Sequence, residues 1–329
     1  RTVRNIKTKS KRNYQFKCAL ESFIAACCWS AQRIHDIKPE VSNICPRCGI
    51  SAETDLHTFW SCPANAIIED EFVINTQELI TQAESGADVY PCLWLRGILP
   101  EFLTQIGSDY LPLDETYISH VNIDIGPEVI KWGSGTYFGD SSGGKHTDHK
   151  ILRRVGCSVV ECDTNGNLLY GSHFNLPGAI QTVARGELYA LVQLIRMIDP
   201  LSDVEFITDN LGVCTSFNKG PAHTAHTQQS INVDLYNELF KLTIDKAVKL
   251  QVRWMPSHLK DEDPLPADVS RIDVLCNRHA DHWAGVAAAE YQLADNITAP
   301  VLKYSLLVSN IQKRLTTIKM NLPKSCILH

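Results

Sequence analysis

The sequence of 329 residues contains no uncharged apolar stretch of about 18 residues or more, and this absence excludes a membrane-spanning helix. It also contains no internal repeat and no low-complexity tract, which excludes solenoid and collagen-like proteins. Hydrophobic residues make up 44% and charged residues 21%, close to the average for globular domains, so a wholly disordered chain is excluded as well. The length indicates about two domains.

Twelve cysteines are present, but they are scattered along the chain. Because secreted disulfide scaffolds are short and dense in cysteine, this distribution predicts ordinary thiols in a reducing, intracellular compartment, apart from one cluster described below. The sequence begins with Arg1 rather than Met, which we interpret as the mark of a processed or truncated piece.

The net charge of −6 argues against a generic nucleic-acid-binding protein. The charge is unevenly distributed, however. Residues 1–17 contain seven Lys and Arg and no acid, and residues 301–329 contain five Lys and Arg and no acid. These basic ends are either contacts for nucleic-acid phosphates or solvated tails.

The pattern of apolar residues from position 133 onward predicts a mixed sheet flanked by helices. The expected strands are 136–140, 157–163, 167–174, 203–209 and 248–255, and the expected helices are 182–198, 232–247 and 277–292. In the N-terminal part, helices are expected at 18–40 and 66–84. Residues 309–323 are expected to form a short basic amphipathic helix that docks on a partner.

Four carboxylates stand out by their positions in these elements. Asp140 and Asp209 follow apolar residues at the C-terminal ends of expected strands, where α/β sheets place their chemistry. Glu187 and Asp281 share helices with apolar runs, at the border of a buried face. Converging carboxylates repel one another unless cations neutralise them, and Mg²⁺ prefers oxygen ligands. We therefore expect two Mg²⁺ or Mn²⁺ ions at these residues.

Five blocks of sequence carry a resemblance to a known family: YFGDSSGG, TVARGELYAL, ITDN, RWMPSH and NRHAD, in this order within residues 133–292. Together they resemble the type 1 ribonuclease H domain, and most closely the versions found in non-LTR retrotransposon polyproteins. The resemblance implies an α/β fold with a ribonuclease H-like, mixed five-stranded sheet. It also implies a metal-dependent endoribonuclease that cuts the RNA strand of RNA/DNA hybrids by a two-metal-ion mechanism.

The resemblance also implies roles for individual residues. Asp140 would bridge both ions, Glu187 and Asp209 would bind the ion beside the leaving 3′ oxygen, and Asp281 would bind the ion that activates water. His258 matches a mobile-loop histidine of the family that moves a proton or helps to release product.

The chain departs from the family pattern at several positions. Gly139 precedes Asp140, and we expect this glycine to allow a backbone conformation closed to other residues. Val183 and Ala184 stand where relatives have asparagines that contact ribose 2′-hydroxyls, so selectivity for RNA is less secure than metal binding. Residues 261–276 form a longer, acidic loop after His258, which either covers the site or is simply solvated.

A second cluster, Cys45, Cys48, His57 and Cys62, has a spacing typical of a structural Zn²⁺ site with four nitrogen or sulfur ligands. It resembles the zinc-binding segment that follows the reverse transcriptase in non-LTR retroelements. The other interpretation is a set of buried thiols beside an unrelated histidine. Such a closed site would serve structure or nucleic-acid binding rather than catalysis.

Four segments are therefore expected: a basic arm and helical zinc-binding module (1–110), a linker (111–132), a ribonuclease H-like domain (133–293) and a basic C-terminal tail (294–329). The first functional hypothesis is the hybrid-cutting enzyme, with a nuclear or cytoplasmic location if the chain is a retroelement product. The alternative is a domesticated structural or RNA-binding subunit of a large ribonucleoprotein such as a mitochondrial ribosome, with little turnover. The expected partner is nucleic acid, either an RNA/DNA hybrid or structured RNA, joined in the second case by proteins.

Overall fold

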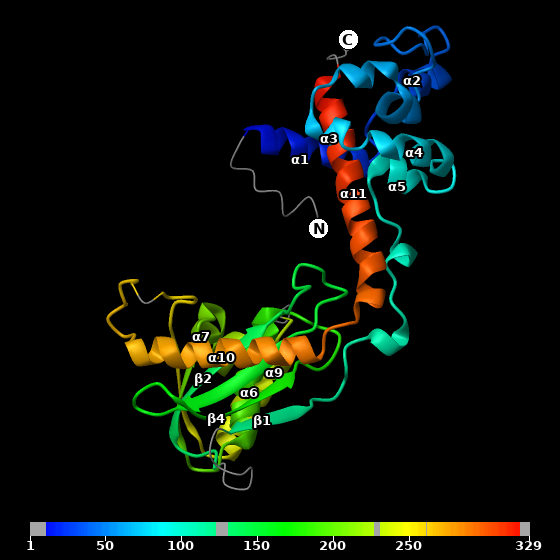
Figure 1. Cartoon of the computed structure of the whole chain (residues 1–329). Coiled ribbons are helices and arrows are strands. Elements are labelled where there is room, and N and C mark those ends of the chain that lie inside the picture. The colour runs from blue at the N-terminus through cyan, green and yellow to red at the C-terminus, as the bar shows by residue number, and fades with distance from the viewer. Residues whose placement is uncertain (1–10, 123–130, 227–230, 261, 323–329) are drawn as a thin grey trace. The chain divides into compact units, whose positions relative to one another are not determined.

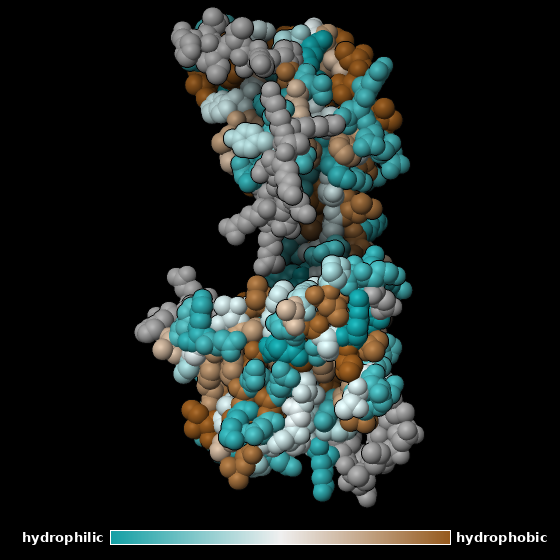
Figure 2. All heavy atoms as spheres, turned by 90° about the vertical axis from the view of Figure 1, so that its left-hand side faces the viewer, coloured by the Kyte–Doolittle hydropathy of each residue, from teal (hydrophilic) through white to brown (hydrophobic). Residues whose placement is uncertain are grey.

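The structure is a computed structural model that describes residues 11–122, 131–226, 231–260 and 262–322. The chain divides into two compact units: unit 1 comprises Arg1–Gln105 and Asp295–His329, and unit 2 comprises Ile106–Ala294. None of the described helices is both long enough and apolar enough to cross a membrane. Figure 2 shows one face of the molecule, on which hydrophobic residues lie in small groups between hydrophilic ones.

Unit 2 is built on a mixed sheet with the strand order β1-β4-β3-β2-β5-β6. β2 pairs with β5, and β5 with β6, in parallel, whereas the other three pairs are antiparallel. The five predicted strands are present, as is the predicted mixed class. The strands are β1 (Ile118–Asn122), β2 (Gly135–Ser142), β3 (Gly156–Cys162), β4 (Leu168–Asn175), β5 (Asp203–Thr208) and β6 (Lys249–Trp254).

The sixth strand, β1, corrects the prediction of a five-stranded sheet, and it lies inside the segment 111–132 that was expected to be a linker. β1 pairs antiparallel with β4, from Ile118 opposite Phe174 to Asn122 opposite Tyr170. Among its first four residues only Val121 is buried. Backbone pairing with β4, rather than an alternating apolar pattern, therefore holds this edge strand in place.

Helices cover both faces of this sheet (Figure 1). Alternate residues of β3 point to opposite faces: Cys157 and Val159 belong to the core that contains Leu191 of α6, whereas Val160 packs in the core that contains Ala280 of α10. The Ser158 hydroxyl donates to the Ala280 carbonyl and ties α10 to the sheet. The helices of unit 2 are α6 (Val183–Met197), α7 (Leu211–Asn218), α8 (Pro221–His226), α9 (Val233–Asp245) and α10 (Arg271–Glu290).

Gly139 is explained by close packing and not, as the sequence suggested, by backbone freedom. It is not among the glycines with positive φ. A Cβ at this position would lie 2.4 Å from the Phe206 ring and 3.5 Å from Ala190 of α6. Similarly, a Cβ at Gly186 would lie 2.7 Å from the Ser141 side chain. The two glycines therefore let α6 approach the sheet beside Asp140.

Unit 1 is helical, and its core includes the C-terminal segment of the chain. α11 contributes Ile311, Leu315 and Ile318 to a cluster that also contains Phe23 and Trp60. The segment 294–329, expected to be a basic tail, is therefore mostly a helix with one buried face, and that face is not available to dock on a partner. The helices of unit 1 are α1 (Lys11–Ile24), α2 (Ala31–Ile37), α3 (Glu71–Ile74), α4 (Ile80–Gly86), α5 (Pro91–Arg96) and α11 (Asp295–Asn321).

The two helices predicted for the N-terminal part are both broken. In 18–40 the chain leaves the helical path after Ile24, at Ala26 with φ of 56°, and this turn allows Cys28 to be buried in the core. The predicted helix 66–84 splits into α3, a short 3₁₀ turn and α4. The Asp70 side chain caps α3 by accepting from the Phe72 amide, so a new helix begins there.

A buried arginine ties α11 to the rest of unit 1. Arg314 is fully buried, and its Nε donates to the Phe59 carbonyl at 2.9 Å. Its Nη1 donates to the Val73 carbonyl and the Thr76 hydroxyl, both at 3.1 Å, and its guanidinium lies 4.9 Å from the Trp60 ring. Burial lowers the pKa of Arg314 to about 10. The partners are carbonyls, a hydroxyl and a ring, so removing the guanidinium leaves buried acceptors unsatisfied.

We expect Arg314→Met to lower the free energy of unfolding by about 3 kcal/mol, because hydrogen bonds from a charged donor contribute about 1.5–3 kcal/mol each. Lys303→Met, at an exposed position of the same helix, should change it by no more than about 0.5 kcal/mol. Urea unfolding followed by circular dichroism measures both. Equal midpoints for the two variants would contradict the role assigned to Arg314.

Candidate functional site

The parallel pairing of β2 with β5 brings two of the predicted carboxylates together. Tyr137 is opposite Phe206 and Phe138 is opposite Ile207, so extending this register by two residues places Asp140 beside Asp209. Paired strands lie about 4.8 Å apart. The two carboxylates therefore meet at the C-terminal end of these strands, as the sequence predicted.

Glu187 reaches the same place from α6. It is only 2% exposed, and its Oε1 accepts a hydrogen bond from the Ser141 amide at 3.0 Å. The Ser141 hydroxyl lies 3.1 Å from the same oxygen, and the Thr208 hydroxyl donates to Oε2 at 3.3 Å. Glu187 is therefore fixed between the ends of β2 and β5.

The three carboxylates fit a divalent metal ion. Asp140, Glu187 and Asp209 can each offer one oxygen, and these atoms all lie within 4.8 Å of one another. Oxygen donors of this kind are the ligands that Mg²⁺ takes in proteins, usually together with water and substrate oxygens. The donor set thus supports the predicted oxygen-ligated metal site for these three residues.

Asp281 and His258 lie in the same cavity but outside this trio. The cavity has a volume of about 180 Å³ and is lined by both residues together with Asp140 and Asp209. Asp281, on α10, is exposed. His258 is also exposed and has a left-handed φ of 52°, which is strained for a residue other than glycine. Their catalytic roles stay predictions.

Burial and mutual repulsion control the protonation of the trio. Burial, assisted by the charges of Asp209 and Asp281, raises the pKa of Asp140 to about 7. Burial and the neighbouring Asp140 raise the pKa of Glu187 well above its usual range. Burial also raises the pKa of Asp209, an effect that the charge of His258 partly offsets. A bound cation would favour the ionised forms of all three carboxylates.

Sequence reasoning missed four polar residues at this site. Ser141 and Thr208 orient Glu187, and their only sequence signal is that each adjoins a predicted aspartate. Asn277 and Arg278 line the cavity from α10. Asn277 is 7% exposed, and its Oδ1 has no hydrogen-bond partner among the described residues. Its position one helical turn before Asp281 is a signal that could have identified it.

The Cys/His cluster in unit 1 has the geometry of a closed zinc site. The Cys45 and Cys62 sulfurs are 3.9 Å apart, and the Cys48 sulfur is 3.4 Å from His57 Nε2. Tetrahedral Zn²⁺ with ordinary bond lengths requires about 3.8 Å between two sulfurs and about 3.6 Å between sulfur and nitrogen. All four ligand atoms lie within 4.8 Å of one another. The residues therefore fit the predicted Zn²⁺.

The backbone around the Cys/His cluster holds two of its cysteines on one turn and affects the pKa of one of their thiols. An antiparallel bridge between Ile44 and Ala52 closes the turn that carries Cys45 and Cys48. Backbone amides, first that of Ile50, lower the pKa of the Cys48 thiol to about 6, which favours the thiolate that binds metals. Burial raises the pKa of Cys62 to about 11, so this thiol needs the positive charge of a metal to ionise at neutral pH.

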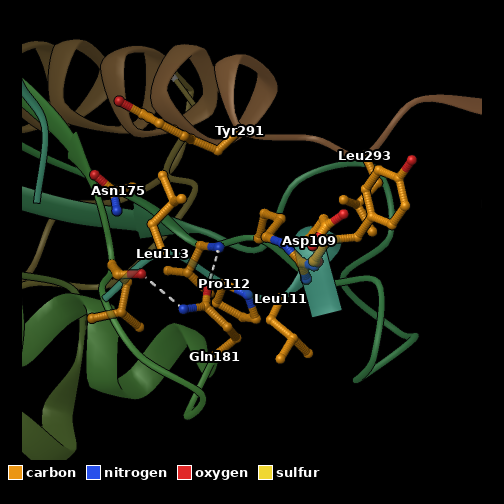
Figure 3. Close-up of a pocket in the computed structure, with 12 residues that line it drawn as sticks. Asp109, Leu111, Pro112, Leu113, Asn175, Gln181, Tyr291 and Leu293 are labelled. Carbon is orange, nitrogen blue, oxygen red and sulfur yellow. Dashed lines mark hydrogen bonds between the residues drawn. The ribbon is translucent and has the colours of Figure 1, made fainter. Parts of the chain in front are cut away.

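A second cavity of unit 2, of about 170 Å³, is shown in Figure 3. Gln181 projects into it, but its amide is already used: Nε2 donates to the Leu176 and Gly178 carbonyls, and Oε1 accepts from the Val155 amide. Arg154, also in the lining, donates to backbone carbonyls of its own loop. Because these polar groups are satisfied within the chain, the carboxylate cavity is the better candidate site.

No protein-family model matches the chain, and no curated protein matches it in sequence. Among solved structures, it is similar to LC11 ribonuclease H1 in complex with an RNA/DNA hybrid, with 13% identity, 47% of this chain and 96% of that chain covered, and a TM-score of 0.33. It is also similar to LC9 ribonuclease H1, described as a type 1 RNase H with the type 2 active-site motif. The identity is 15%, the match covers 52% of this chain and 83% of that chain, and the TM-score is 0.33. The foamy viral protease-reverse transcriptase in complex with an RNA/DNA hybrid gives 12% identity and a TM-score of 0.35, with 51% of this chain but only 22% of that chain covered.

The fold class stands on the strand order and on the helices that cover the two faces of the sheet. Unit 2 is a mixed six-stranded sheet flanked by helices, and unit 1 is a small helical unit that contains a Cys/His cluster.

The zinc site can be tested with a matched pair of cysteine variants. We expect the chain to hold about one zinc ion, and Cys48→Ser to lose it and part of its helical signal, because a structural zinc site contributes directly to folding. Cys92→Ser replaces an exposed cysteine of α5 and should keep the metal. Metal analysis and circular dichroism measure both effects. Equal zinc contents in the two variants would contradict the assignment of a zinc site to this cluster.

The carboxylate site predicts an unusual dependence of stability on pH. An acid whose pKa is higher in the folded state stabilises the fold below its unfolded pKa, and this contribution is lost as the pH rises through the folded pKa. For Asp140 these values are 3.8 and about 7. In Mg²⁺-free buffer, we therefore expect the free energy of unfolding to fall between about pH 4 and pH 7, by about 4 kcal/mol at most.

The variant Asp140→Asn should show a smaller loss in the free energy of unfolding between about pH 4 and pH 7 than the parent chain. The variant Asp199→Asn, changed at an exposed position, should lose as much as the parent. Urea unfolding at several pH values measures the difference. If Asp140→Asn and the parent lose the same stability over this range, the carboxylate cluster does not carry the charge repulsion described above.

Proposed function

We propose that unit 2 is a metal-dependent phosphodiester hydrolase of the ribonuclease H type, which cuts the RNA strand of RNA/DNA hybrids. The observation that carries this proposal is the convergence of ligand atoms of Asp140, Glu187 and Asp209 within 4.8 Å of one another, at the C-terminal end of the parallel strands of a mixed sheet. The five sequence blocks that resemble type 1 ribonuclease H supply the substrate class.

The chemistry follows from the residues around the cavity. Two Mg²⁺ ions, when bound, stabilise the attacking and leaving oxygens of an in-line displacement at phosphorus. Asp140, Glu187 and Asp209 would hold the metal, and the hydrogen bonds from Ser141 and Thr208 keep the Glu187 carboxylate in place. His258, in the cavity lining, is suited to move a proton because its two ring nitrogens can accept and donate one.

We also propose that the chain derives from the C-terminal part of a non-LTR retrotransposon polyprotein, and that it acts in the nucleus or the cytoplasm. The support is the order of its two sites, with the Cys/His cluster at residues 45–62 followed by the carboxylate site of unit 2. The zinc ion would stabilise unit 1. No observation in the described residues favours the alternative, a structural subunit of a ribonucleoprotein.

Cleavage of a labelled RNA/DNA hybrid with Mg²⁺ tests the proposed enzyme, with duplex RNA and duplex DNA as comparison substrates. We expect cleavage of the RNA strand of the hybrid and a loss of about 10³-fold in Asp209→Asn, because metal clamping contributes several kcal/mol to the rate. Asp199→Asn should retain full activity. If the parent chain leaves the hybrid intact over a range of Mg²⁺ and Mn²⁺ concentrations while a control nuclease cuts it, the proposed function is wrong.

A further inference from the structure

The loop between β6 and α10 carries His258, and three arginines hold it from outside. Arg253 of β6 donates from Nη1 to the Asp268 carbonyl at 2.8 Å. From α10, Arg271 donates to the Lys260 and Asp263 carbonyls, at 3.2 and 3.0 Å, and Arg278 donates to the Leu259 carbonyl at 3.2 Å. The described residues of this loop form no helix or strand. Its path is held by these contacts between guanidinium groups and carbonyls together with the packing of Met255, Leu259 and Val269 against the core that contains Ala280.

Two of the three arginines belong to the general framework of unit 2. Arg253 also pairs with Glu205 at 3.0 Å and with Asp273 at 3.1 Å, which joins β5 and β6 to the start of α10. Arg271 holds a turn in which the Lys260 amide donates to the Asp263 carboxylate at 2.8 Å. Neither Arg253 nor Arg271 is in the lining of the carboxylate cavity.

Arg278 is different because it connects the loop to the site itself. It lines the cavity together with His258, Leu259 and Asp281, and it precedes Asp281 by three residues, so both side chains lie on one face of α10. Its contact with the loop is at Leu259, the residue that directly follows His258. The arginine thus couples the helix that carries Asp281 to the residue next to the histidine.

The backbone of His258 explains why such a contact is needed. Its φ of 52° is a left-handed conformation, which costs a residue other than glycine about 1–2 kcal/mol. His258 is exposed, so packing of its own side chain contributes little to hold that conformation. A hydrogen bond to the next carbonyl restrains the adjoining peptide and with it the direction of the imidazole.

We propose that Arg278 is a positioning residue for His258, which keeps the imidazole at the carboxylate cavity by holding the Leu259 carbonyl. This inference rests on the proposed function for its kinetic test. It makes no use of a contact between Arg278 and the substrate, and a direct contact with a phosphate is the competing outcome.

Kinetics on the full chain separate the two outcomes through a double-mutant cycle on the RNA/DNA hybrid. We expect Arg278→Gln to lower kcat about tenfold without changing KM, as is usual for residues that orient a functional group. His258→Ala should lower kcat by about 10²-fold. In the His258→Ala background, Arg278→Gln should then change kcat less than about twofold, because its effect passes through the missing imidazole. A raised KM, or effects that multiply in the double variant, would overturn the proposal.

A second measurement does not depend on activity. Hydrogen exchange should become faster in the segment 255–260 of Arg278→Gln, and remain unchanged there in Arg196→Gln, a control arginine of α6 that pairs with Glu238. If the parent chain does not cleave the hybrid, the enzyme proposal fails, and the exchange result alone decides the role of Arg278. Unchanged exchange at 255–260 would then reject it.

Discussion

The parallel pairing of β2 with β5 is the constraint on which the candidate site depends. It fixes Asp140 beside Asp209 at the C-terminal edge of the sheet, and α6 brings Glu187 to the same point. Three carboxylates in one partly buried place repel one another, and burial adds to the penalty on their charged forms. The amide of Ser141 and the hydroxyl of Thr208 donate to Glu187, but neither donor carries a charge. At a pH where all three carboxylates are ionised, a bound cation removes this repulsion, so the arrangement is suited to metal binding and destabilises the fold when no metal is bound.

Arginine side chains that donate to backbone carbonyls appear in both units, with different consequences. Arg314 is fully buried in unit 1, where no water can replace its partners, so its contacts with Phe59 and Val73 define the place of α11. Arg271 and Arg278 of unit 2 are exposed, and water competes for the same carbonyls. Their contacts therefore restrain the His258 loop less firmly than Arg314 restrains α11.

The sequence predicted most of unit 2 because its strands carry their own signals. In each of β2 and β5, a short run of apolar residues leads directly to an aspartate. The apolar runs indicated the sheet, and the aspartates indicated the site. β1 escaped prediction because three of its residues, Ile118, Ser119 and His120, are exposed, and only its pairing with β4 makes it a strand. The second half of α11 was expected as a helix within 309–323, but the first half was missed because Pro300 lies inside it. The burial of the helix was missed because its buried face includes Arg314, and arginine is a residue type that usually faces solvent.

The two candidate metal sites differ in the number and the kind of ligands that the chain supplies. The cluster in unit 1 offers three sulfurs and one nitrogen, enough to complete a tetrahedron around Zn²⁺ and leave no position for another molecule. The trio in unit 2 offers three carboxylates, fewer than the six ligands or so that Mg²⁺ requires, so water and substrate oxygens must complete its coordination. On the function proposed above, the chemistry would take place in unit 2, in the cavity that Asp140 and Asp209 line together with His258 and Asp281. A zinc ion in unit 1 would instead have a structural role, because a metal with four protein ligands has no free position for a reacting group.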